Sequence, residues 1–142
     1  MKTSRIATAL SLIGAAFIIY VGINFLTNPE AAADGFGLPA WPHGDEADFL
    51  NIKGVRDVSS GLIILALLAF RQRFALGITT LVVALTPIGD MLTVLTHNGS
   101  AAAAFGIHGL TAALVILTGA LLLREPRTAP ITTSTVTPAT VR

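Results

Sequence analysis

The sequence predicts an all-α fold, a bundle of four transmembrane helices with both termini in the cytoplasm. Three observations lead to this prediction. Hydrophobic residues make up 53% of the 142 residues and charged residues only 12%, whereas soluble domains carry roughly 25% charged residues. Four apolar runs each approach the ~20 residues that cross about 30 Å of hydrocarbon. Lysine and arginine gather at one end of these runs.

The four runs are predicted to be helices because backbone polar groups in lipid must be satisfied within their own segment. They cover residues 6–26, 51–70, 74–95 and 101–123. Together they form a single membrane domain over residues 1–127, with the long loop 27–50 kept irregular by its glycines and prolines. The tail 128–142 is rich in Thr and Pro and is predicted to be a disordered cytoplasmic tail.

The orientation follows from the lysines and arginines that flank the predicted spans. They precede the first span, occupy the turn between the second and third, and follow the fourth: Lys2, Arg5, Arg71, Arg73, Arg124 and Arg127. The loop 27–50 has no Lys or Arg and five acidic residues. The positive-inside rule therefore places both termini in the cytoplasm and the long loop outside. We expect a multi-pass protein of the plasma membrane or an endomembrane.

A cleaved signal peptide over Met1–Ala33 is the alternative for the first run, since Lys2 and Arg5 precede it. Its apolar stretch of about 20 residues exceeds the 7–15 residues of a signal peptide, which favours a retained span. Small residues also recur at helix-packing spacing, as in Ala7, Ser11 and Ala15. Such rows suit close helix packing in the bundle or in a homo-oligomer.

Polar side chains within the spans are the main functional signal, because burying an ionisable group in a bilayer costs at least ~2.5–3.5 kcal/mol. At 1.5 Å per residue, Arg56, Asp57, Asp90 and His108 all lie roughly 8–10 Å below the outer surface. Tyr20 and Asn24 lie near the outer end of the first span. Groups from all four helices are therefore predicted to form one layer in the outer leaflet.

These groups also lie on defined helix faces. Lys53, Arg56, Asp57 and Ser60 follow an i, i+3, i+4, i+7 pattern, which is one face of a helix. A polar face in an apolar helix is expected to point into the bundle. Lys53 lies within one turn of the interface and is expected to extend its ammonium group to water. Pro87 cannot donate its backbone N–H, which favours a kink below Asp90.

The layer supplies the groups needed for general acid–base chemistry. We predict that Asp57, Asp90, Arg56 and His108 are catalytic: one carboxylate activates water or removes a proton, the other acid or His108 donates one, and Arg56 orients the carboxylates. Tyr20 and Asn24 are predicted to position substrate or water. The expected substrate is a lipophilic small molecule held among membrane lipid, and the reaction an epoxide hydrolysis, cyclisation or isomerisation.

Other interpretations of the same residues stay open. The charges can form an interhelical ion pair in a non-catalytic structural or accessory protein, or belong to a small transporter subunit. The loop 27–50 is either a connector or a lid over an outward-facing pocket. A metal site at Asp57, Asp90 and His108 is disfavoured by the neighbouring cations, so we expect neither metal nor cofactor. A net charge of +1 gives no sign of a nucleic-acid partner.

Three segments carry a family resemblance. GVRDVSSGLIILALL at 54–68, PIGDMLTVL at 87–95 and GIHG at 106–109 resemble the small four-helix membrane proteins of the domain-of-unknown-function family 4267. The resemblance implies the same fold and membrane location. Its signature positions would correspond to Arg56, Asp57, Asp90 and His108.

Overall fold

The computed structural model describes residues 2–125, and that range contains helices and no strand. The expected tail 128–142 lies outside the described residues. The elements, in chain order, are α1 Lys2–Thr27, α2 Pro29–Asp34, the 3₁₀ helix η1 Gly44–Phe49, α3 Leu50–Ala69, α4 Arg73–Val83, α5 Leu85–Thr96, α6 Ala101–Ala103, the π-helix η2 Ala104–Gly109 and α7 Leu110–Leu123.

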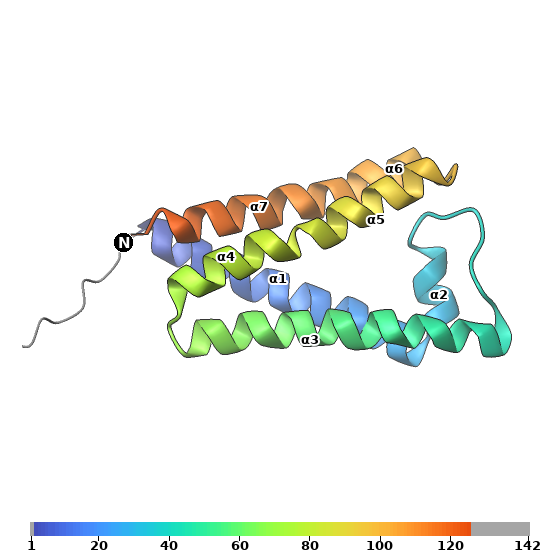
Figure 1. Cartoon of the computed structure of the whole chain (residues 1–142), viewed down its shortest axis with the longest axis horizontal. Helices are drawn as coiled ribbons and strands as arrows, with labels where there is room; N and C mark the ends of the chain where they lie inside the picture. The colour runs from blue at the N-terminus through green and yellow to red at the C-terminus, as the bar shows by residue number, and fades with distance from the viewer. Residues whose placement is uncertain (1, 126–142) are drawn as a thin grey trace, which may run out of the picture.

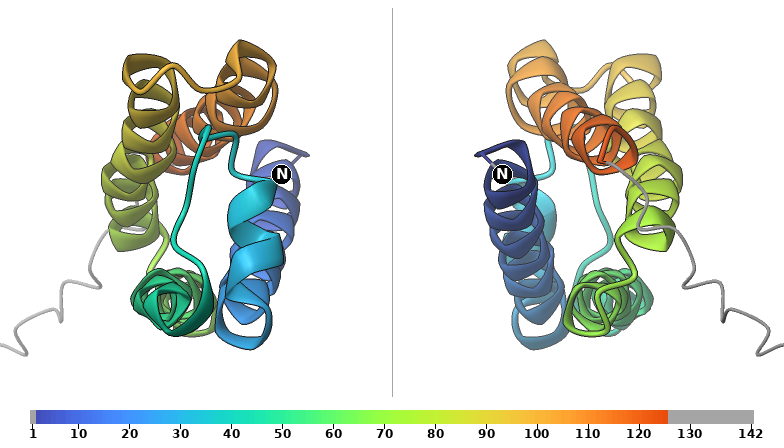
Figure 2. Two further views of the ribbon diagram at one scale, coloured as in Figure 1. Left: turned by 90° about the vertical axis from the view of Figure 1, so that its right-hand side faces the viewer. Right: turned by 90° about the vertical axis from the view of Figure 1, so that its left-hand side faces the viewer.

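The helices form two pairs. One pair is α1 packed along α3, and the other is α4 and α5 packed along α7 and η2 (Figure 1). The pairs meet at the end that holds the N-terminus of α1, which we call the terminal end. They diverge toward the end that holds α2, η1 and α6, which we call the loop end (Figures 1 and 2). This divergence is what positions the site described below.

All four predicted spans are helical, but two of them are interrupted. The third divides at Ala84 into α4 and α5, three residues before Pro87, as the expected kink requires. The fourth begins with a turn of α-helix, continues as the π-helix η2 and then becomes α7. Neither the π-helix nor the short helices of the long loop were predicted from the sequence.

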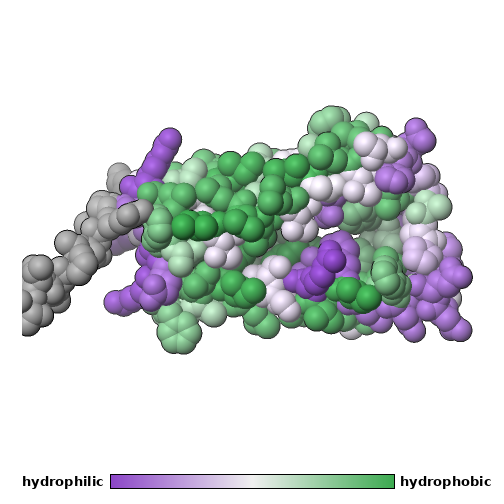
Figure 3. Space-filling model, in the orientation of Figure 1, coloured by the Kyte–Doolittle hydropathy of each residue, from purple (hydrophilic) through white to green (hydrophobic). Residues whose placement is uncertain are grey.

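Three helical stretches are long and apolar enough to cross a membrane: Thr3–Thr27, Arg73–Thr96 and Ala101–Leu123. The fourth predicted span, α3, has 20 residues and carries Lys53, Arg56 and Asp57 in its first half. Large apolar side chains cover much of the outer surface (Figure 3), which is the surface expected of helices that face lipid. Length and composition therefore indicate a helical membrane protein.

The α1–α3 pair is held together by close backbone contact. A Cβ atom built on Gly22 would lie 2.7 Å from the carbonyl oxygen of Gly54, and one built on Gly54 would lie 2.8 Å from that of Gly22. Further along the interface, Gly61 lies against the backbone of Ala15. Small residues permit this approach, and close packing is what drives helix association in lipid.

A polar clasp closes the terminal end. The Nε of Arg73, at the start of α4, donates to Glu125 Oε2 at 2.8 Å, and its Nη2 pairs with Glu125 Oε1. Its Nη1 donates to Thr8 Oγ1 on α1 at 2.8 Å. Because the Arg73 guanidinium hydrogen-bonds to it, the pKa of Glu125 lies below its ordinary value. One arginine thus joins α4, α1 and the end of α7.

Candidate functional site

A cavity of about 800 Å³ lies between the two helix pairs, within the range of small-molecule sites. Side chains of α1, α3, α4, α5, η2 and α7 line it, together with residues around α2. The backbones of α3 and α5 do not approach one another, and Figure 3 shows a hollow between these two helices, with hydrophilic side chains on its α3 side. The divergence of the pairs therefore leaves an open, lined space.

The α3 wall of the cavity carries an ion pair. Lys53 Nζ donates to Asp57 Oδ2 at 2.5 Å, one helical turn away. Asp57 is only 4% exposed. The ammonium group also lies 4.7 Å from the centre of the Phe25 ring and 5.7 Å from that of Phe36, within cation–π distance. This pairing fixes the Asp57 side chain on the α3 wall of the cavity.

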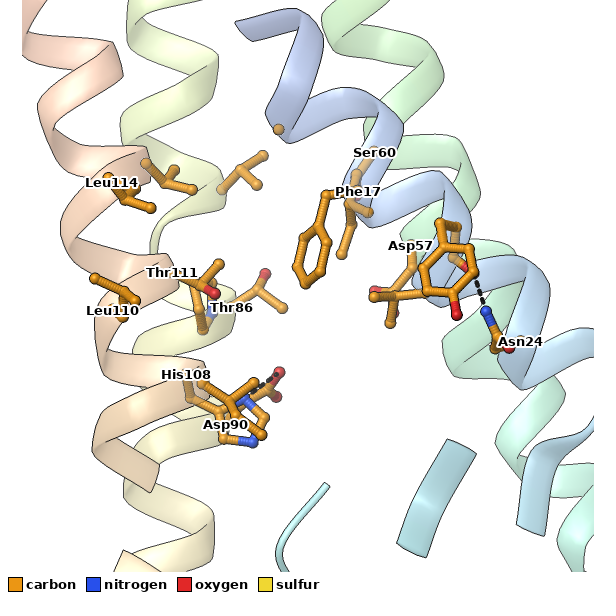
Figure 4. A pocket seen from close by; sticks show the side chains of 18 of the residues that line it. Phe17, Asn24, Asp57, Ser60, Thr86, Asp90, His108, Leu110, Thr111 and Leu114 are labelled. Atoms are coloured by element: carbon orange, nitrogen blue, oxygen red, sulfur yellow. Dashed lines mark hydrogen bonds and ion pairs between the residues drawn. The ribbon is translucent and has the colours of Figure 1, made fainter. Parts of the chain in front are cut away.

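The opposite wall carries Asp90, on α5, and His108, on η2 (Figure 4). His108 Nδ1 lies 3.9 Å from Asp90 Oδ2, and His108 Nε2 lies 2.9 Å from the carbonyl oxygen of Phe36. A carbonyl oxygen only accepts, so Nε2 must carry a proton. Nδ1 therefore faces Asp90 either as a donor to a carboxylate or as an acceptor near a protonated acid.

The π-helix explains the position of His108. Single π turns inside α-helices are rare and occur frequently at functional sites. Here η2 runs over Ala104–Gly109, and His108 within it is 7% exposed and lines the cavity. The only hint in the sequence is the pair of glycines, Gly106 and Gly109, on either side of it.

Five of the six predicted site residues line this one cavity: Tyr20, Asn24, Asp57, Asp90 and His108. In Figure 4, Asp57 lies on the wall opposite Asp90 and His108, with open space between them. Asn24 donates its side-chain amide to the Tyr20 carbonyl at 2.7 Å, so that amide is held by its own helix. The predicted polar layer is therefore present as the loop-end half of the cavity.

Arg56 is the exception. Its side chain is exposed and does not line the cavity, and the cation that pairs with Asp57 is Lys53. The expectation that Arg56 orients the carboxylates and that Lys53 extends to water is therefore corrected. The reason is angular: residues 53 and 57 are separated by 40° around the helix, whereas 56 lies 60° to the other side of 53 at about 100° per residue.

Phe36, in the long loop, is a site residue that was not predicted from the sequence. Its ring lies 4.5 Å from the His108 ring, centre to centre, and its carbonyl accepts from His108. The next residue, Gly37, has φ +98° and accepts a hydrogen bond from Ser100 N at 2.8 Å. In the sequence, the feature that could have indicated this role is the motif Gly35-Phe36-Gly37, an aromatic residue between two glycines.

The long loop is fastened within itself as well. Glu30, on α2, accepts hydrogen bonds from Gly44 N and from His43 Nδ1, each at 2.9 Å. With Phe36 packed on His108, these contacts hold the loop across the loop end of the cavity. This arrangement favours the lid over the plain connector.

Comparison with known proteins identifies one matching family. Residues 15–122 match the model of the family described as a domain of unknown function (DUF4267), which covers well over half of the chain. No curated protein and no solved structure gives a match.

Proposed function

Because this chain belongs to the DUF4267 family, which has no assigned function, we propose a function from its cavity. We propose that the protein is a membrane-embedded enzyme that applies general acid–base chemistry to a lipophilic small molecule. Opening of an epoxide by water is the concrete reaction, with cyclisation or isomerisation as chemically related outcomes. In this proposal all four spans cross the membrane and both termini are cytoplasmic.

One observation supports the proposal most directly. Asp57 and Asp90 lie on opposite walls of the same 800 Å³ cavity, and His108 stands beside Asp90. A structural role for these charges would favour a sealed core with no open space between the two carboxyl groups. Two carboxylates that face a shared space are instead the arrangement that acid–base catalysis requires.

The two walls suit different roles. Asp57 pairs with the Lys53 ammonium group, and we assign Asp57 as the base. The Asp90–His108 pair lies on the opposite wall, and we assign this pair, in its protonated form, as the acid. In epoxide hydrolysis, Asp57 accepts a proton from water as the water oxygen bonds to a ring carbon. The carbon–oxygen bond breaks, and the ring oxygen takes the proton of the Asp90–His108 pair. Proton return from Asp57 through water restores the site.

The surroundings strengthen these interactions. Leu110, Leu114 and Phe17 contribute apolar surface beside the polar groups (Figure 4). Charges in such a medium interact far more strongly than in water. A proton donor fixed by the Phe36 carbonyl also needs little reorganisation during the reaction.

The test uses the full chain in lipid nanodiscs with a panel of lipophilic epoxides in ¹⁸O-labelled water. We expect a labelled diol from at least one substrate, and a loss of about 10²-fold or more in kcat for Asp90→Asn. Asp45→Asn is the matched control, because Asp45 is exposed on η1. Turnover by Asp90→Asn equal to wild type would remove Asp90 from the mechanism, and a complete absence of labelled product would overturn epoxide hydrolysis.

A further inference from the structure

We infer that the cavity binds an uncharged, elongated lipophile that comes from the bilayer, with its polar group at the loop end and its apolar chain extending toward the terminal end. This inference rests on the proposed function for the identity of the reacting end. The binding geometry is argued separately, from the charge, shape and rim of the cavity.

The charges on the cavity wall cancel. Lys53 and Asp57 form one neutral pair. On the opposite wall His108 Nδ1 lies 3.9 Å from Asp90 Oδ2, so an acid and a base stand side by side there as well. Among the described residues that line these walls, no cation or anion is left over to balance a charged ligand. Bringing an unpaired charge into such a space is strongly unfavourable, so a neutral ligand is favoured over a carboxylate or an amine.

The cavity has two zones along its length. The loop-end zone carries the polar groups of the site, and the zone toward the terminal end is apolar, with walls from three helices: Leu10, Ile13, Gly14, Ile18, Ile64, Leu114 and Val115. Thr80 and Thr118 line the far end, and each lies ten residues from Asp90 or His108. At 1.5 Å per residue, the apolar zone extends about 15 Å from the acid–base groups.

The rim between α1 and α7 points to the bilayer as the source of the ligand. Ile13, Phe17, Leu110 and Leu114 line the cavity and are nevertheless 46–66% exposed. These side chains therefore present apolar surface along the gap between α1 and α7, where the cavity lies open. A lipophile dissolved among acyl chains would pass this rim without leaving an apolar environment.

Gly14 allows the geometry to be tested. It lines the apolar zone, and a Cβ atom added there would meet nothing within 4 Å. Gly14→Phe is therefore expected to place a ring in the cavity without disturbing α1. Ala16→Phe is the matched control, since Ala16 is exposed on the same helix and does not line the cavity.

The experiment measures binding of a tritiated twelve-carbon methyl ketone to the full chain in nanodiscs. We expect saturable binding, with the acid and the amine of the same chain length competing at least about tenfold more weakly. Gly14→Phe should weaken binding about tenfold or more, and Ala16→Phe should leave it unchanged. Equal binding by Gly14→Phe, stronger competition by the acid or the amine, or no saturable binding would overturn the inference.

The two proposals fail separately. If the ketone binds saturably and Gly14→Phe weakens that binding, but no epoxide is turned over, the hydrolase proposal is overturned and the proposed ligand class is retained. Epoxide turnover that Gly14→Phe leaves intact would preserve the hydrolase proposal and overturn the proposed binding geometry.

Discussion

His108 donates its Nε2 proton to the carbonyl oxygen of Phe36 at 2.9 Å, and this contact fixes which ring nitrogen faces the cavity. The orienting group is a backbone carbonyl from a loop 72 residues away in the sequence. Backbone carbonyls commonly set a histidine's tautomer in this way. Folding of the long loop and preparation of the acid are therefore one event.

This contact predicts a single proton position in His108. In ¹⁵N-histidine-labelled protein, Nε2 of His108 should show a protonated shift throughout the pH range in which the chain stays folded. His43 and His97 are exposed outside the cavity, and their separate signals provide the comparison within the same spectrum. A spectrum in which His108 Nε2 is unprotonated would contradict the assigned hydrogen bond.

The Lys53–Asp57 pair predicts an asymmetric mutational cycle. Lys53→Met leaves a carboxylate that is 4% exposed without its cation, and removing one partner of a buried pair typically costs about 3–5 kcal/mol. The double variant Lys53→Met/Asp57→Leu removes both charges and should recover most of this stability. Thermal unfolding in detergent measures both, and Arg56→Met, on the exposed flank, should have little effect.

The cycle also separates stability from activity. The double variant should fold and yet lack turnover, since it has no base. If it unfolded as readily as Lys53→Met, the pair would not be the source of the loss.

The clasp at the terminal end predicts a pH dependence of stability. The pKa of Glu125 is lowered from its ordinary 4.5 by hydrogen bonds from Arg73. A group whose pKa is lower in the folded state stabilises the fold above its unfolded pKa, and that contribution disappears as the pH falls through the folded value. Wild type should therefore lose stability below about pH 4.5 more steeply than Glu125→Gln.

At neutral pH, Glu125→Gln should cost roughly 1.5–3 kcal/mol, the range for a hydrogen bond to a charged group. Glu46→Gln provides the control, because Glu46 is exposed at the loop end. Parallel stability profiles for wild type and Glu125→Gln across the acid range would show that the clasp does not carry the effect.

The membrane orientation is testable because the chain contains no cysteine. Single cysteines at Arg71 and at Asp45, both exposed positions at opposite ends of the bundle, can be labelled with a membrane-impermeant maleimide on intact cells. We expect labelling at 45 from outside and at 71 only after permeabilisation, as the positive-inside rule requires. The reversed pattern would invert the predicted topology.

Sequence patterns predicted the helices, and the placing of three polar residues in one cavity, for a physical reason. The thickness of the hydrocarbon layer fixes span length, and the helical rise converts residue number into depth. Asp57, Asp90 and His108 could therefore be assigned to one level from residue spacing alone. Residue spacing could not predict which of Lys53 and Arg56 faces inward. Both lie within one broad polar arc, and the α1–α3 crossing decides between them.

The remaining parts of the site depend on contacts that leave no periodic pattern. Docking of Phe36 is set by loop geometry, including the positive φ of Gly37. The π turn at His108 adds one residue to a helix that the sequence predicts to be regular. Both were invisible to hydropathy and spacing, and both shape the acid side of the cavity.

The two helix pairs are joined at the terminal end and separate toward the loop end (Figures 1 and 2). At one end a buried apolar cluster that includes Ala7, Leu76 and Leu122 joins them together with the Arg73 clasp. At the other end the loop around Phe36 bridges them. Arg73 contacts α1 at Thr8, 19 residues before the end of the helix, so a rotation of about 5° there would move the tip of α1, roughly 29 Å away, by about 2.5 Å. The distance between the two acids therefore depends on packing at the terminal end, far from the acids themselves.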